Sequence, residues 1–530
     1  MMASKMIRGT MILTVAAFFS RFLGILFVIP YYWLTGEQGS FLYQYAYTPY
    51  AIMLSVSTLG LPLAVSKFVS KYNSMGDYES GRRLLKSGFL VMLATGIVGF
   101  LILFLGAPGI TSLMHIPKEE YGNVVLVIRV VSIAIIIVPV MSLMRGYFQG
   151  FQSMGPTAVS QVVEQVVRVG FILIGAFIVV KVAHGSVVTA AALATFAAFV
   201  GAVGGLYVML HYWVLRRVKI MKTSNKSRPE RRYRMSFVTM YKELITYAVP
   251  FVAVGIAMQV YQLIDQSMAF YYLNYVDEIK EAIITDLTMN DQKLVIIPVT
   301  LATSLAVSAV PAIIVSFSKG DMRAVNEKIT QAFELVLFLT IPAAVGLSVL
   351  GYMVHGLLYT VSPDLLKIGG RVLSWYAPTA LFFALFQVGA SILQGINRQL
   401  VTIIALGSGI LFKILLNPLS MKLFGMVGPV IATDIGYLIS ILIIVFAIRK
   451  ATDYRFSMIA QQLIHILFYT GIMVLVIELI FFVSGGNFPH SRGKAFIVII
   501  LSVTIGAAVY LLLAKWTGLL RRVMGRSRER

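Results

Sequence analysis

The sequence predicts an all-α protein that crosses a membrane many times, and three observations support this. Of its 530 residues, 58% are hydrophobic and 12% are charged, whereas about 25% are charged in average soluble domains. The mean hydropathy is correspondingly high, at +0.86. Apolar stretches long enough to cross a hydrocarbon core of about 30 Å recur along the whole chain. We therefore expect about fourteen transmembrane helices, arranged as two six-helix lobes followed by two C-terminal helices.

The expected helices are apolar segments of about 17 to 30 residues, separated by polar residues or by Gly and Pro. Their approximate ranges are 8–34, 41–69, 84–106, 122–147, 156–181, 187–215, 243–272, 293–317, 328–356, 369–393, 399–420, 425–448, 459–484 and 494–518. The first follows Lys5 and Arg8 and runs to about Leu34 without an obvious small-residue cleavage site. This stretch is too long for the apolar core of a signal peptide, so we expect it to remain as the first span.

The net charge of +22 would suggest nucleic-acid binding in a soluble protein, but here the distribution of the charge gives it another meaning. If the N-terminus is cytoplasmic, about 31 of the 44 Lys and Arg residues lie on the cytoplasmic side. The predicted orientation therefore places both termini in the cytoplasm. The densest basic run, Arg216 to Arg234, is interpreted as part of a cytoplasmic linker, with binding to lipid headgroups or to a partner as the alternative.

An internal repeat indicates that the two lobes are copies of each other. Similar short sequences recur in the same order at offsets of 238 to 245 residues. The matching pairs are Arg129 to Ser132 with Arg371 to Ser374, Gln149-Gly150 with Gln394-Gly395, Arg168 with Lys413, and Ala194-Thr195 with Ala432-Thr433. Because six helices return the chain to its starting side, the copies are expected to be related by a pseudo-two-fold axis along the membrane normal. The predicted segments are 1–215 and 243–455 for the lobes, 216–242 for the linker, and 456–530 for two further helices and a basic tail.

The residue inventory excludes several kinds of chemistry. The chain has no Cys, so disulfides, thiolate metal sites, iron–sulfur clusters and Cys nucleophiles are absent. Its six His residues include no pair at zinc-ligand spacing. We therefore expect no metal site, no cofactor and no catalytic residue.

Four ionisable residues fall inside the expected N-terminal spans: Arg21, Arg129, Glu164 and Arg168. Charges at bilayer depth are costly, so they normally face a cavity or a partner. Arg21 lies near the middle of its helix and is predicted to face an aqueous cavity. Arg129 either joins it or reaches the outer interface along its aliphatic stem. Glu164 and Arg168 either line the cavity or form a pair one helical turn apart.

The C-terminal lobe carries a second set of intramembrane charges. Asp265, Lys413 and Asp434 are expected at similar depth, and Asn417 stands one turn from Lys413. Two interpretations remain open at this point. The buried lysine and its acidic partners are either a structural connection between helices or a site that couples transport to a cation or proton.

The helix pattern, the Ser20-Arg21-Phe22-Leu23-Gly24 element and the Gln-Gly and Ala-Thr repeats together resemble the multidrug/oligosaccharidyl-lipid/polysaccharide (MOP) exporter superfamily. Within it, the chain is most similar to the MurJ-type lipid II flippases of the YtgP/SpoVB branch. The resemblance implies alternating-access export of lipid II, a polyprenyl-pyrophosphate-linked peptidoglycan precursor, across a bacterial cytoplasmic membrane for cell-wall synthesis. It also implies that Arg21 lines the substrate cavity.

The resemblance further implies a sodium ion among helices 7, 11 and 12, where Asp265 and Thr433 suit the ligand positions. Lys413, however, occupies a place where a ligand is expected, which argues against bound sodium. The cavity arginines that the family carries in helices 2 and 8 are also not evident here, and Arg129 and Arg168 are candidates to replace them. The expected partners are the lipid-linked anionic glycan, the bilayer and cell-wall synthesis or division machinery, with the protein itself a monomer.

Three other functions are compatible with parts of the sequence. A cation-coupled drug or metabolite antiporter of the same fold would use acidic and aromatic cavity groups, and the N-terminal arginines argue against it. A membrane enzyme acting on the same carrier generally needs catalytic side chains in a large outer loop, whereas the longest expected outer loop, Asn274–Gln292, contains acidic residues but no His and is interpreted as a solvated linker. A flippase for a sporulation or teichoic-type polymer stays open, because no residue identifies the sugar.

Overall fold

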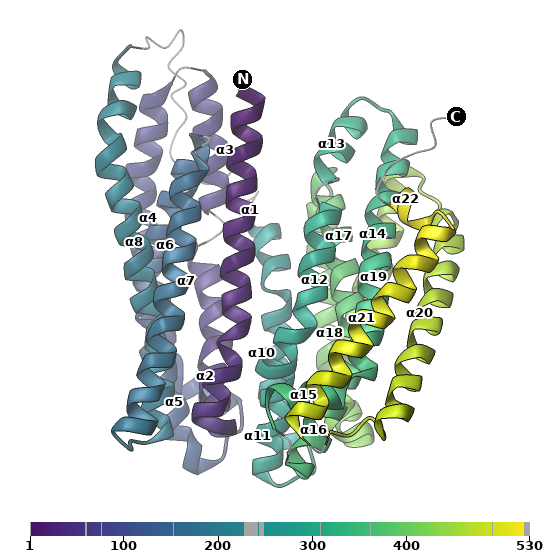
Figure 1. The fold of residues 1–530 in the computed structure, drawn as a ribbon. Helices are drawn as coiled ribbons and strands as arrows, with labels where there is room; N and C mark the ends of the chain where they lie inside the picture. The colour runs from purple at the N-terminus through teal and green to yellow at the C-terminus, as the bar shows by residue number, and fades with distance from the viewer. Residues whose placement is uncertain are drawn as a thin grey trace. The chain divides into compact units, whose positions relative to one another are not determined.

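The computed structural model describes residues 2–523, apart from residues 59–60, 76, 152, 227–241, 243–247, 308, 361 and 490. Every secondary-structure element in this described part is a helix (Figure 1). Among these described residues, eleven helical segments, or up to twelve if one bent pair counts as a span, are long and apolar enough to cross a membrane. Two of them, Val15–Thr58 and Gln399–Thr452, contain 44 and 54 residues, and each is long enough to cross twice at about 20 residues per crossing. The predicted all-α polytopic class is confirmed, and these segments are consistent with about fourteen crossings.

The chain forms two compact units, Met1–Leu263 and Ile264–Arg530. The helices of the first unit are α1 (Met2–Leu26), α2 (Val28–Thr58), α3 (Leu61–Ser74), α4 (Tyr78–Leu113), α5 (Lys118–Ser132), α6 (Ala134–Gly150), α7 (Met154–Phe177), the π-helix η1 (Ile178–Val182) and α8 (Val187–Lys226). Inside α2, Gly36 has φ 66°, a left-handed conformation that favours glycine and that bends the helix. The unit boundary falls inside α10 (Ala257–Tyr272).

The second unit continues from α10 through the C-terminal helices. They are α11 (Asp277–Thr285), the π-helix η2 (Asp286–Asn290), α12 (Asp291–Val307), α13 (Val310–Ser318), α14 (Met322–Val349), α15 (Gly351–Leu358), α16 (Pro363–Tyr376), α17 (Thr379–Gly395), α18 (Gln399–Phe424), the 3₁₀ turn η3 (Gly425–Val427), α19 (Gly428–Thr452), α20 (Ser457–Ser484), α21 (Arg492–Trp516) and α22 (Leu519–Val523).

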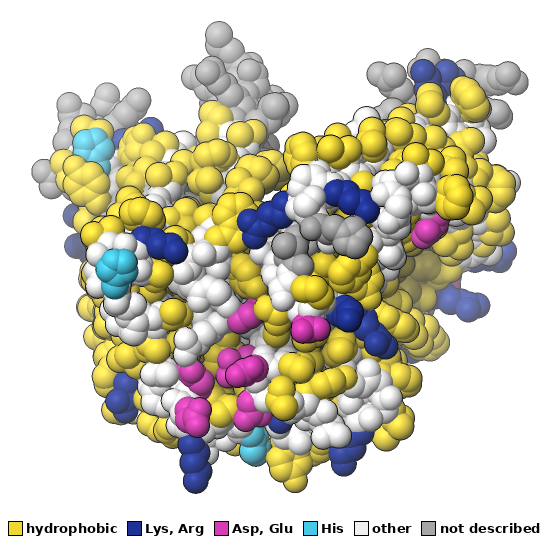
Figure 2. Space-filling model, turned by 60° about the horizontal axis from the view of Figure 1, so that its bottom comes forward, with side chains coloured by type: hydrophobic (Ala, Val, Ile, Leu, Met, Phe, Trp, Pro, Cys, Tyr) yellow, Lys and Arg dark blue, Asp and Glu magenta, His cyan; other side chains and the backbone are white. Residues whose placement is uncertain are grey.

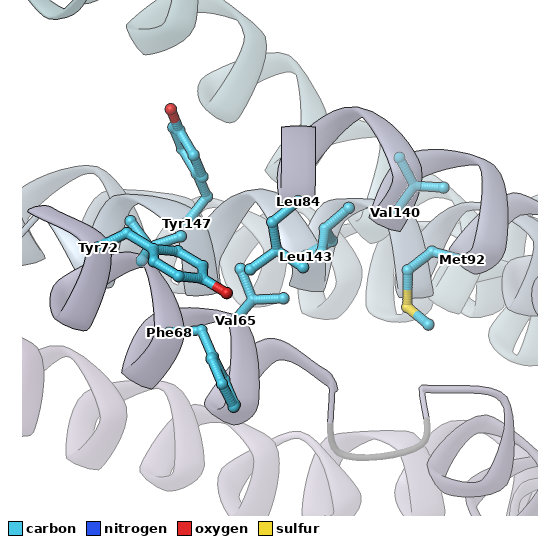
Figure 3. Close-up of a cluster of buried hydrophobic side chains, with 9 residues drawn as sticks. Val65, Phe68, Tyr72, Leu84, Met92, Val140, Leu143 and Tyr147 are labelled. Carbon is cyan, nitrogen blue, oxygen red and sulfur yellow. The ribbon is translucent and has the colours of Figure 1, made fainter. Parts of the chain in front are cut away.

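A buried hydrophobic cluster joins α3, α4 and α6 in the first unit (Figure 3). Its members are Val65, Phe68, Val69, Tyr72, Leu84, Met92, Val140, Leu143 and Tyr147. The α3 members recur at intervals of three and four residues, so they share one face of that helix. Burying a side chain of this size contributes about 1.5 to 3 kcal/mol, and the cluster therefore holds the short helix α3 firmly against α4 and α6.

The Gln-Gly repeat has a packing explanation in each unit. A Cβ atom on Gly150, at the end of α6, would lie 2.6 Å from Cβ of Val69 in α3. A Cβ atom on Gly395, at the end of α17, would lie 3.0 Å from Cγ1 of Val310 in α13. Both glycines thus permit a close helix approach at the same position of the repeat, which supports the interpretation of the two lobes as copies.

The outer surface of the helices is largely apolar. Hydrophobic side chains cover most of the face visible in Figure 2. In α20 and α21, the side chains of Phe482, Val483 and Trp516 are 85%, 80% and 78% exposed. Such extended apolar surface is unusual for a soluble protein and is what contact with lipid requires.

One expectation from the sequence is wrong. The segment 274–292 was predicted to be a solvated acidic linker, yet most of it forms α11 and η2, and Asp286 and Asp291 are 1% and 0% exposed. Its acidic composition suggested solvation, but the helices packed around it remove both carboxylates from water. The predicted linker 216–242 lies mostly outside the described residues, and the division of the chain into four segments remains a prediction.

Candidate functional site: two buried charge networks

The first network joins α6 and α7 through Glu164. Its Oε2 atom lies 2.8 Å from Nη2 of Arg145, and its Oε1 atom lies 3.0 Å from Nη2 of Arg168. Arg145 also donates to Oγ of Ser160, at 2.7 Å from Nη2 and 3.1 Å from Nε. The three charged side chains are only 12–15% exposed, so these interactions are stronger than those of a surface ion pair. One carboxylate thus balances one of two guanidinium groups, leaving a formal charge of +1.

Two glycines in α8 allow this network to form. A Cβ atom on Gly201 would lie 2.8 Å from the carbonyl oxygen of Glu164 and 2.9 Å from Cβ of Arg168. A Cβ atom on Gly205 would lie 3.2 Å from Nη2 of Arg145, and the Gly205 carbonyl accepts a hydrogen bond from Ser160 at 2.9 Å. Glycines four residues apart let two membrane helices approach closely, and here they bring α8 against the charged face of α7.

Arg168 is placed to bind a further group. Its Nε atom is buried and has no hydrogen-bond partner among the described residues. The phenols of Tyr43, Tyr47 and Tyr50 in α2 lie within electrostatic range of its guanidinium group. A buried N–H that is not satisfied by the protein, beside several hydroxyl groups, is a site at which an anionic oxygen gains charge-assisted hydrogen bonds.

The other two predicted cavity arginines lie apart from this network. Arg129 in α5 donates from Nε to the carbonyl oxygen of Phe104 at 3.4 Å and stacks on the Phe104 ring, with 5.2 Å to the centroid. Arg21 is exposed on α1, one turn before Gly24, which faces the amide of Gln165 in α7. The structure therefore pairs Arg168 with Glu164, attaches Arg129 to α4, and leaves the Arg21 side chain accessible.

The second network surrounds Lys413 of α18 in the second unit. The Nζ atom donates to Oδ1 of Asp265 at 2.5 Å and to Oδ1 of Asn417 at 3.0 Å. It also donates to the carbonyl oxygen of Pro429 at 2.7 Å and to Oγ1 of Thr433 at 2.8 Å. Lys413 is 0% exposed. Four oxygen atoms from α10, α18 and α19 thus enclose one ammonium group, which has three protons to share among them.

Asp434 has a separate partner. Its Oδ1 atom accepts a hydrogen bond from Oγ1 of Thr379 in α17 at 2.6 Å, while Lys413 lies only within its electrostatic range. The structure therefore brings together the predicted residues Asp265, Lys413, Asn417 and Thr433, and connects Asp434 to a neighbouring helix. Chemically, the ammonium supplies the positive charge that a bound cation would otherwise bring to these oxygen atoms.

Sequence reasoning missed several contributors to the two networks, among them Arg145, Ser160 and the carbonyl group of Pro429. Arg145 lies close to the end of the expected span 122–147, so it was not counted among the charges inside the membrane. No sequence pattern singles out Ser160. The small-xxx-small spacing of Gly201 and Gly205 is the one feature that could have indicated a close helix contact beside it. Pro429 contributes its backbone carbonyl oxygen, which a pattern of side chains does not reveal.

Buried ion pairs between long apolar helices are typical of membrane transporters. Solved structures share this fold. The lipid II flippase MurJ in an inward closed conformation aligns with a TM-score of 0.62 at 16% identity, covering 97% of this chain and 99% of that chain. An inward-facing multidrug resistance MATE family transporter of the MOP superfamily aligns with a TM-score of 0.66 at 12% identity, covering 82% and 95%.

Sequence comparison identifies the family. The family described as polysaccharide biosynthesis protein matches residues 6–317, and MatE matches residues 287–419. The lipid II flippase MurJ of Bacillus subtilis (strain 168) is 40% identical over 535 residues, covering 99% of this chain and 98% of that protein. Stage V sporulation protein B of the same organism is 25% identical over 336 residues, covering 62% of each. This chain belongs to the polysaccharide biosynthesis protein family, in the MurJ-type branch of the MOP superfamily that the sequence predicted.

Proposed function

We propose that this protein is a flippase that moves lipid II from the inner to the outer leaflet of a bacterial cytoplasmic membrane. The observation that carries the proposal is the 40% identity to the Bacillus subtilis lipid II flippase along nearly the whole of both chains. The residues of the first unit support it, because the substrate head group contains a pyrophosphate. Arginine binds such a group through a planar fork of donors.

Arg21 and Arg168 are the proposed contacts to this anion. Arg21 is accessible, and Arg168 retains a buried N–H beside three tyrosine hydroxyl groups. Glu164 orients Arg168 and Arg145 and limits their excess charge, so that the anion is attracted without being held permanently. Arg129 is proposed to have a structural role at α4 instead, since its guanidinium is already engaged by Phe104.

The energy for export is proposed to come mainly from the membrane potential. An inside-negative potential favours outward movement of an uncompensated negative charge by about 2.3 kcal/mol per charge per 100 mV. Lys413 is proposed to occupy the place of a bound cation with a fixed charge that holds α10, α18 and α19 together, so sodium is not required. The orientation consistent with this direction has both termini in the cytoplasm, as the positive-inside distribution predicts. We also propose that the protein works as a monomer beside cell-wall synthesis enzymes.

Complementation of a bacterium depleted of its own lipid II flippase tests the proposal. The wild-type chain is expected to restore growth, and Arg21→Ala is expected to fail while its abundance in the membrane stays normal. Arg323→Ala is the matched control, since this arginine is also accessible, with a side chain 92% exposed, and is expected to retain full activity. Full complementation by Arg21→Ala would remove Arg21 from the substrate path, and failure of the wild-type chain would refute the proposed substrate.

A further inference from the structure

Two aspartates and a histidine meet in the interior of the second unit. One ligand atom from each of Asp286, Asp291 and His355 lies within 4.8 Å of the other two. Nδ1 of His355 is 3.2 Å from Oδ1 of Asp291, although the two residues are 64 positions apart in the sequence. The three residues are 1%, 0% and 1% exposed. They belong to η2, α12 and α15, and the α11 and α15 labels lie at the same end of this unit in Figure 1.

The π-helix η2 explains how the two carboxylates come together. Asp286 begins η2 and Asp291 directly follows it, five residues later. In an α-helix, residues five apart point about 140° away from each other around the axis. The wider i to i+5 hydrogen bonding of a π-helix places them one turn apart on the same side. Such single-turn π-helices are frequent at functional sites, because they redirect side chains that an α-helix would separate.

A further oxygen atom, which would be a fourth potential ligand atom, lies beside the cluster. The Nδ2 atom of Asn290 donates to Oδ1 of Asp286 at 2.9 Å, so this side chain points into the cluster. Its Oδ1 atom is buried and has no hydrogen-bond partner among the described residues, and Asn290 as a whole is 0% exposed. The backbone carbonyl of Asn290 is held by the hydroxyl of Tyr359 at 3.0 Å. An amide oxygen buried without a partner is costly, and a bound cation would satisfy it.

Gly369 leaves room for the imidazole ring of His355. A Cβ atom on Gly369 of α16 would lie 2.0 Å from Cε1 and 2.1 Å from Nε2 of His355. Any larger residue at position 369 would displace the ring. Since α16 packs against α11, η2, α12 and α15, it closes the cluster on this side and keeps the imidazole directed at Asp291.

We propose that Asp286, Asp291 and His355 bind a first-row divalent metal ion such as Zn²⁺ or Mn²⁺. Carboxylate oxygens of Asp286 and Asp291 serve as anionic ligands of such an ion, and a neutral imidazole serves as its nitrogen ligand. Carboxylate, imidazole and amide ligands together suit these ions, whereas Ca²⁺ and Mg²⁺ favour sites made of oxygen alone. The ion would connect η2 and α12 to α15. This inference concerns the second unit alone and does not depend on which lipid the protein moves.

Metal analysis of the full-length protein in detergent tests the proposal, with purification through an affinity tag that contains no histidine. About one Zn²⁺ or Mn²⁺ per chain is expected to remain after dialysis, and EDTA is expected to lower the thermal midpoint. Adding back Zn²⁺ or Mn²⁺ should restore the midpoint, whereas equal Mg²⁺ should not. Added Mn²⁺ should also give an EPR signal of bound rather than hydrated ion.

Two variants and a control make the outcome decisive. His355→Gln and Asp291→Asn are expected to lose both the retained metal and the metal-dependent shift of the midpoint. His465→Gln in α20 removes a histidine outside the cluster and should keep both. If the wild-type protein retains no ion and is insensitive to EDTA, the cluster is a hydrogen-bonded triad without metal and the proposal is wrong. An equal midpoint shift in all four proteins would place the metal elsewhere and would also overturn it.

Discussion

Replacing Lys413 by Met removes the ammonium group from the centre of the second network while preserving an unbranched side chain of similar length. The Asp265 carboxylate stays buried, since this residue is only 7% exposed. It loses the Nζ atom that lies 2.5 Å from it in the wild-type protein. The oxygen atoms of Asn417, Pro429 and Thr433 lose the same donor. The perturbation therefore creates an unpaired charge in an apolar interior rather than a cavity.

The expected loss of stability follows from this burial. Removing one partner of a buried ion pair costs about 3 to 5 kcal/mol, because the remaining charge is not compensated. Total folding stabilities are about 5 to 15 kcal/mol, so the single variant should be visibly destabilised. In Lys413→Met with Asp265→Asn, no charge remains, and most of the loss should be recovered. A residual cost of about 1 to 3 kcal/mol is expected from hydrogen-bonding groups that lose their partner.

A double-mutant cycle measures this coupling. Unfolding of the wild-type protein, both single variants and the double variant would be followed in detergent, and each would be scored for complementation. Asp265→Asn alone leaves the ammonium unpaired and should cost as much as Lys413→Met alone, so we expect a coupling energy of at least about 3 kcal/mol. We also expect restored transport in the double variant, as for a fixed charge that stabilises the fold. Additive losses would refute the energetic pairing of Lys413 with Asp265. A stable double variant without transport would instead show that the charge itself takes part in the cycle.

Three further predictions follow from the packing around the two networks. Lys413→Ala leaves four oxygen atoms around the vacated ammonium position, which a sodium ion can then occupy. The thermal midpoint of this variant should therefore be higher in NaCl than in choline chloride, whereas that of the wild-type protein should be the same in both salts. Glu164→Gln removes the carboxylate between two arginines and should lower the unfolding free energy by about 1.5 to 3 kcal/mol, while the exposed control Glu79→Gln should cost less than about 1 kcal/mol. Gly201→Ala places a Cβ 2.8 Å from the Glu164 carbonyl oxygen and should cost about 1 to 3 kcal/mol, whereas nothing lies within 4 Å of a Cβ at Gly170, so Gly170→Ala should be neutral or stabilising.

The helical class and the position of each charged residue along its helix were predictable from the sequence. Apolar segment lengths predicted an all-α polytopic chain, and residue counts from the span ends placed Asp265 and Lys413 at the same depth. The structure adds the direct contact between them. Depth along a helix can be counted from the sequence, because each residue adds about 1.5 Å.

The parts that depend on helix rotation and on local departures from the α-helix were not predictable. Arg145 reaches Glu164 only because α6 and α7 face each other, and no residue count fixes that orientation. Asp286 and Asp291 appeared solvated, because an acidic segment between two spans normally is. The π-helical turn and the distant His355 bury them instead. His355 carried no signal of its own, since its partner is 64 residues away.

Transport in a defined membrane tests the central claim most directly. Vesicles that contain only this protein and lipid II in the leaflet matching the cytoplasmic face would be given a membrane potential, negative on that side, in sodium-free buffer. Appearance of lipid II in the opposite leaflet would be followed with a probe that cannot cross the membrane. The account predicts potential-dependent appearance without sodium, and its loss in Arg21→Ala but not in Arg323→Ala. No appearance of lipid II under any potential, or appearance only when sodium is added, would contradict it.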